Sequence, residues 1–78
     1  MPGAALKLPR LTADQLIRAI SKAGFSEIRQ SGSHKIFKNA EGKRITVPYH
    51  KGKTLHPKLV QAAIHDTGLS LEEFLGLL

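Results

Sequence analysis

The chain contains no cysteine and no tryptophan, and its aromatic residues are one tyrosine and three phenylalanines. The absence of cysteine excludes disulfides and thiolate metal sites, and it fits a reducing compartment. No apolar run approaches the roughly 20 residues of a transmembrane helix, and residues 1–10 lack the apolar core of a signal peptide. We therefore expect a cytoplasmic protein with no membrane partner.

The sequence also lacks the spacing of several familiar catalytic and metal-binding motifs. The segment HKGKT at 50–54 ends like a P-loop, but the upstream glycine of that motif is missing. Asp14 and Asp66 fall in predicted helices, far along the chain from His34, so no Ser-His-Asp arrangement is indicated. None of the four histidines is spaced i, i+4 from another. We therefore expect no bound metal and no cofactor.

Positive charge, in contrast, is abundant and unevenly distributed. The formal net charge is +6, and residues 29–58 hold eight lysines and arginines against Glu41 alone. A field of one sign favours a polyanionic partner such as nucleic acid. The same charges can serve solubility alone, and composition does not decide between these two interpretations.

Seventy-eight residues form one small domain, with too little core for a large enclosed cavity. Residues 1–11 carry two prolines and a glycine and are predicted to be a flexible N-terminal arm, which leaves 12–78 as the domain. The segment TADQ is a capping box that begins a helix over 12–23. A second helix is predicted from Pro57 to Gly68, and SLEE begins a short third helix at residue 70.

The middle of the chain predicts three short strands, at 25–30, 34–39 and 43–47. The segments SGS and NAEG supply the turns between them. These connections are too short for crossovers, so the strands must be antiparallel. The predicted fold is α+β, in the order α-β-β-β-α with a short C-terminal helix, and the helices cover one face of the sheet while the other stays open.

His34 is the strongest candidate for chemistry, because it directly follows the Ser31-Gly32-Ser33 turn in a basic stretch. A histidine titrates near neutrality and can accept the proton of an RNA 2′-hydroxyl, while cations stabilise charge on the attacked phosphate. An ordinary surface histidine in a turn is the alternative. Because Ile36 and Phe37 are both apolar, alternation does not tell which face of the sheet His34 occupies.

The cations close to His34 in the sequence are the candidate RNA contacts, namely Arg29, Lys35, Lys38, Lys43, Arg44, Lys51 and Lys53. Ser33 and His50 are secondary candidates, and His50 can be a second acid or base, a phosphate contact or simply solvated. Phe37 and Tyr49 are too few for a base-stacking platform, and Phe37 is expected in the core.

Several short motifs, in order, resemble those of a known family. They are AGF closing the first helix, GSH entering the second strand, VPYH leaving the third and GLSLEEF near the C-terminus. Together they make the chain similar to the HicA-type mRNA interferase toxins, also called the YcfA-like family. The likeness runs from about Thr12 to Leu75. The second helix departs from the family's usual Pro-Gly-Thr start, because it begins Pro57-Lys58-Leu59.

The resemblance implies a fold like that of a double-stranded-RNA-binding domain and the activity of a type II toxin, a metal-independent endoribonuclease that cleaves mRNA and halts translation. It implies that His34, the histidine of the GSH motif, is catalytic. It also implies a HicB-type antitoxin that covers this histidine. Two other functions fit the same residues: a non-catalytic RNA-binding module, and a protein whose basic face binds only an acidic partner.

Overall fold

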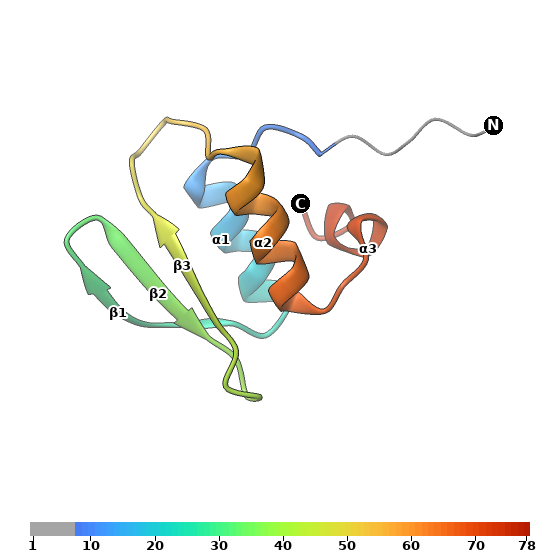
Figure 1. Cartoon of the computed structure of the whole chain (residues 1–78), viewed down its shortest axis with the longest axis horizontal. Helices are drawn as coiled ribbons and strands as arrows, with labels where there is room; N and C mark the ends of the chain where they lie inside the picture. The colour runs from blue at the N-terminus through green and yellow to red at the C-terminus, as the bar shows by residue number, and fades with distance from the viewer. Residues whose placement is uncertain (1–7) are drawn as a thin grey trace.

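The computed structural model describes residues 8–78 and confirms the predicted order of elements (Figure 1). The elements are α1 (Ala13–Lys22), β1 (Ser26–Ser31), β2 (His34–Lys38), β3 (Arg44–Pro48), α2 (Pro57–Thr67) and α3 (Leu71–Leu75). The first strand begins one residue later than predicted, because Phe25 is buried and its N–H donates to the Ile20 carbonyl at the end of α1.

Side-chain caps define where two of the helices begin. At α1, the Thr12 hydroxyl accepts from the Gln15 N–H at 3.2 Å, and the Gln15 side chain accepts from the Thr12 N–H at 2.9 Å. Ser70 and Glu73 form the same reciprocal pair at α3. These bonds satisfy N–H groups that have no partner within the helix, and they explain why helix starts are readable from sequence.

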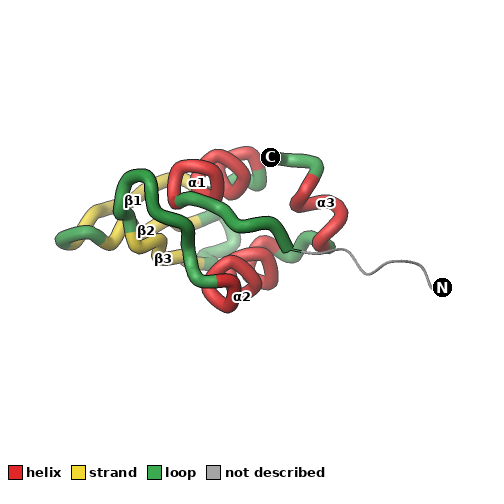
Figure 2. Tube along the Cα trace, turned by 90° about the horizontal axis from the view of Figure 1, so that it is seen from above, coloured by secondary structure: helices red, strands yellow, loops and turns green. Residues whose placement is uncertain are grey.

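The three strands form one antiparallel sheet with β2 in the centre. Phe37 of β2 lies opposite Ile45 of β3, and both are buried together with Val47. These residues face α1 and α2, which pack against one side of the sheet (Figure 2). No element within residues 8–78 covers the other side, which is called the uncovered face below. The predicted α+β class and antiparallel sheet are thus confirmed.

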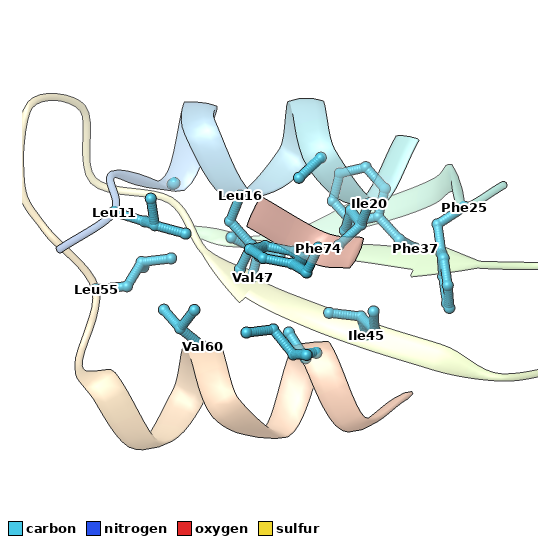
Figure 3. Packing of buried hydrophobic residues seen from close by; sticks show 14 residues of the cluster. Leu11, Leu16, Ile20, Phe25, Phe37, Ile45, Val47, Leu55, Val60 and Phe74 are labelled. Atoms are coloured by element: carbon cyan, nitrogen blue, oxygen red, sulfur yellow. The ribbon is translucent and has the colours of Figure 1, made fainter. Parts of the chain in front are cut away.

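One hydrophobic cluster holds these layers together (Figure 3). Its members come from all three helices, from β2 and β3 and from the segments between, and no polar or charged side chain is buried within residues 8–78. α3 lies beyond α1 and α2 as seen from the sheet, and it contributes Phe74, which is fully buried (Figures 1 and 2). No helix in the described part of the chain is long and apolar enough to cross a membrane.

The boundary between the predicted arm and the domain lies earlier than Thr12. Residues 1–7 of the arm fall outside the described residues. Leu11 is 2% exposed, and its carbonyl accepts from the Leu55 N–H at 2.7 Å. Leu8 also packs against the core. The prediction failed at these residues because the pairing with Leu55 is a long-range contact that local composition does not indicate.

Candidate functional site

A two-residue hairpin loop positions His34 at the first residue of β2. Ser31 pairs with His34, so Gly32 and Ser33 form the loop, and Gly32 has a φ of 58°. A glycine with positive φ at the first loop position suits the type II′ turn that joins tightly paired strands. The Gln30 side chain donates to the Gly32 carbonyl at 3.0 Å and braces the turn. The imidazole of His34 is exposed at this end of the sheet.

Strand register answers the question that alternation left open, and it places His34 on the uncovered face. Residues paired across strands point to the same side of a sheet, and neighbours along a strand point to opposite sides. Phe37 is buried against the helices, so His34, Ile36 and Lys38 point away from them. The uncovered face therefore carries three rows, which are Ser31–His34–Pro48, Arg29–Ile36–Thr46 and Ser26–Lys38–Arg44.

A bulge in β1 brings Arg29 onto this face. Glu27 pairs with Phe37 and Arg29 with Ile36, so Ile28 is an extra residue between them. In a regular strand Arg29 would pair with Lys35 and point to the same side as Glu27, toward the helices. The bulge shifts its pairing to Ile36, so Arg29 points to the uncovered face. Arg29 then lies diagonally across from His34, about 7–8 Å away between Cα atoms. None of the three rows contains a carboxylate.

Lys35 points the other way, toward the helices, because it pairs with buried Val47. Its ammonium lies 4.3 Å from the centroid of the Tyr49 ring, which gives a cation–π contact. A hydrogen bond to the Asp14 carboxylate, with smaller contributions from burial and Coulombic repulsion, raises the pKa of Tyr49. The sequence reasoning missed this cluster of Asp14, Lys35 and Tyr49. Extending the alternation of Ile45 and Val47 to Tyr49 would have placed the ring on the helix side.

The loop after β3, which carries two further lysines, begins at the end of the sheet where β2 starts and runs to α2 (Figure 1). The Tyr49 N–H donates to the Ser33 carbonyl at 2.7 Å, which ties the loop to the histidine turn. The Lys53 N–H donates to the His50 carbonyl at 3.1 Å, and this turn carries Lys51 and Lys53 as exposed side chains. His50 is exposed at the beginning of the turn.

The remaining candidate cations gather at the opposite end of the sheet. Lys38 and Arg44 pair across β2 and β3, and Lys43 lies in the turn before β3. The Asn39 side chain fixes that turn by accepting from the N–H groups of Glu41 and Lys43. The structure therefore divides the predicted basic residues into two groups, one at each end of the sheet, and Arg29 shares the uncovered face with His34.

The other two histidines have ordinary roles. His56 caps α2, since its Nδ1 accepts from the Lys58 N–H at 3.1 Å. His65 is an exposed residue of α2, with 89% of its side chain accessible. Within residues 8–78, no three histidine, aspartate or glutamate side chains are grouped so as to hold a metal ion.

The family model described as the HicA toxin of bacterial toxin–antitoxin matches residues 13–69, from the start of α1 to just past α2. The chain belongs to the HicA toxin family. The three strands and the two longer helices of the toxin lie within the match, whereas α3 lies beyond it. A search of curated proteins finds no match to the toxin.

Membership of this family makes the toxin one half of a toxin–antitoxin pair. His34, the hairpin turn and the bulge at Ile28 all fall inside the matched span. The match supports a toxin role for the whole domain and assigns no individual residue.

Proposed function

We propose that the toxin is a metal-independent endoribonuclease that cleaves mRNA in the cytoplasm, with His34 as its catalytic base. The observation that carries this proposal is the position of His34 on an uncovered, carboxylate-free face, with Arg29 directed to the same face by the bulge. A polyanion can approach this face without repulsion from acidic side chains.

The proposed reaction is an intramolecular transesterification, in which the 2′-oxygen of the RNA displaces the 5′-oxygen from the adjacent phosphorus. The imidazole accepts the 2′-hydroxyl proton, the 2′-oxygen forms a bond to the adjacent phosphorus, and the bond from phosphorus to the 5′-oxygen breaks. The leaving 5′-oxygen takes a proton from the imidazolium, so the products are a 2′,3′-cyclic phosphate and a 5′-hydroxyl. Arg29 is suited to stabilise the charge that develops on the phosphate, and Ser33 and His50 are secondary candidates at the same end.

The lysines near His34 have separate proposed tasks. Lys51 and Lys53, on the turn after β3, would hold phosphates beside the histidine turn. Lys35 is held by Tyr49 on the helix side, so it would act at the edge of the site rather than on the uncovered face. Lys43 would contribute from the turn at the far end.

The test compares purified toxin with two histidine variants on a long unstructured mRNA in EDTA. His34→Ala is expected to abolish cleavage, whereas His65→Ala, which removes an exposed histidine from α2, should cleave like the wild type. Fragments from the wild type should end in a 2′,3′-cyclic phosphate. Cleavage that survives in His34→Ala would refute the catalytic role. Intact RNA that is shifted equally by all three proteins would identify a non-catalytic RNA-binding module instead.

The antitoxin partner is proposed to be of the HicB type and to cover His34. A net charge of +6 favours an acidic partner surface, and the uncovered sheet face is where RNA and antitoxin would compete. Adding the antitoxin should stop both RNA cleavage and RNA binding. If RNA still binds to the complex, the antitoxin covers another surface.

A further inference from the structure

Lys38 and Arg44 form an unusual pair at the end of the uncovered face that lies away from His34. They are directly opposite each other on β2 and β3, and both are exposed. Like charges at directly opposed positions destabilise an antiparallel pair. Glu41 of the adjoining turn makes no ion pair with either side chain within residues 8–78, where the only pair is His65 with Asp66. An anion bound between the two side chains would relieve this repulsion.

The pair lies on the same face as His34 and at a definite separation from it. Lys38 follows His34 by four residues along one strand, so the two positions are about 13 Å apart at roughly 3.3 Å per residue. The row between them holds Ile36 on the central strand, with Arg29 and Thr46 on the two edge strands. No carboxylate interrupts the path.

This separation corresponds to a short length of single-stranded RNA. An extended strand places successive phosphates roughly 6 Å apart, well beyond the 3.4 Å axial rise per nucleotide of a stacked duplex strand. Two such steps span the distance from His34 to the far pair. The row of Arg29, Ile36 and Thr46 contains no aromatic ring on which a base could stack. The protein would therefore contact mainly the sugar-phosphate backbone of the RNA.

We propose that Lys38 and Arg44 form a second phosphate subsite, which binds the RNA phosphate two nucleotide steps from the one that is cleaved. The substrate is then single-stranded RNA lying along β2, and its productive binding requires at least two further nucleotides on one side of the scissile bond. This inference rests on the proposed nuclease function and adds a minimum substrate length to it.

The experiment uses DNA oligonucleotides that contain one ribonucleotide, so that cleavage is possible at one phosphate only. The chain is lengthened by one to four nucleotides on either side of that position, and kcat/KM is measured in EDTA. We expect a rise of about tenfold or more when the second phosphate is added on one side, the size of one charge-assisted contact. A neutral methylphosphonate at that phosphate should remove the rise.

Two variants test whether the pair is responsible. Lys38→Gln with Arg44→Gln should lose most of the rise, so that long and short oligonucleotides are cut with similar kcat/KM. Lys58→Gln, which removes an exposed lysine of α2, should retain the full length dependence. The double variant should also unfold at the same or a higher urea concentration than the wild type, because it removes a repulsive pair.

The possible failures point to different conclusions. If the wild type cleaves every length equally, or if the gain survives both the methylphosphonate and the double variant, the subsite is wrong while the nuclease stands. If the wild type cleaves no oligonucleotide and no mRNA, the nuclease is wrong and the subsite falls with it. If the double variant folds poorly, the methylphosphonate result alone decides.

Discussion

The strand register decides to which face of the sheet each residue of the basic hairpin points. His34 and Lys35 are neighbours in the chain, yet the first points to the uncovered face and the second to the helices. The proposed base is therefore free to meet RNA, whereas the adjacent cation is held over the ring of Tyr49. A stretch that looks uniformly basic in the sequence thus serves two sides of the sheet.

The contact between Lys35 and Tyr49 should be measurable as a coupling free energy. A cation over an aromatic ring at an exposed site contributes about 0.5–1 kcal/mol. Urea unfolding of Lys35→Met, Tyr49→Leu and the double variant should give a coupling of about that size. Tyr49→Phe retains the ring, so the cycle of Lys35→Met with Tyr49→Phe should give a coupling close to zero. As a control, the changes in unfolding free energy of Lys38→Met, at the far end of the sheet, and Tyr49→Leu should simply add. If the changes for Lys35→Met and Tyr49→Leu also add, the two side chains do not interact and the contact is contradicted.

Individual elements explain why some features could be predicted and others could not. Both capping boxes were predicted because Thr12 with Gln15, and Ser70 with Glu73, satisfy helix ends within four residues of sequence. The bulge at Ile28 could not be predicted, since nothing local distinguishes it from a regular strand residue. It is nevertheless the bulge that turns Arg29 toward the face of His34.

The same limit applies to the candidate site. Its motif residues, Ser33 and His34, were identifiable from the sequence, and so was the basic character of the hairpin. Which cations accompany His34 depends on which strand residues are paired, and this became clear only from Lys35 opposite Val47 and Lys38 opposite Arg44. Register is set by all the buried residues of the sheet together. Because Ile36 is apolar although it lies on the uncovered face, the sequence pattern does not show which residues of β2 are buried.

The short helix α3 should carry a measurable pH dependence through its cap. Hydrogen bonding to the Ser70 backbone, then to its side chain, lowers the pKa of Glu73 below its ordinary value of 4.5 despite slight opposition from desolvation. A carboxylate whose folded pKa is lowered stabilises the protein fully above its unfolded pKa, and this contribution is lost as the pH falls through the folded value. Glu73→Gln should therefore lower the urea midpoint more at pH 7 than at pH 3.

Glu72 provides the matched control for this experiment. It is also an acidic residue in the first turn of α3, but the capping box uses Glu73. Glu72→Gln should show a smaller difference between the two pH values than Glu73→Gln. An equal effect of Glu73→Gln at pH 7 and pH 3 would show that the charge on this side chain does not stabilise the cap.

At the scale of the whole molecule, one hydrophobic cluster supports both the sheet and the proposed site. A chain of 78 residues has a free energy of unfolding on the order of 4–12 kcal/mol, so single core residues take a large share of it. α3 lies beyond the span that matches the family, yet Phe74 is the largest fully buried side chain of the described core. The C-terminal helix is therefore part of the folding unit that holds His34 in place.

Replacing Phe74 tests this dependence directly. Phe74→Ala leaves a cavity among the helices and should lower the free energy of unfolding by about 3–5 kcal/mol, measured by urea titration. Leu78→Ala, at a side chain that is 44% exposed, should cost far less. The loss should appear in a single transition, because sheet and helices share one core. If Phe74→Ala unfolds like Leu78→Ala, or if α3 melts in a separate step while the sheet remains intact, the C-terminal helix is an appendage to the folding unit and not part of it.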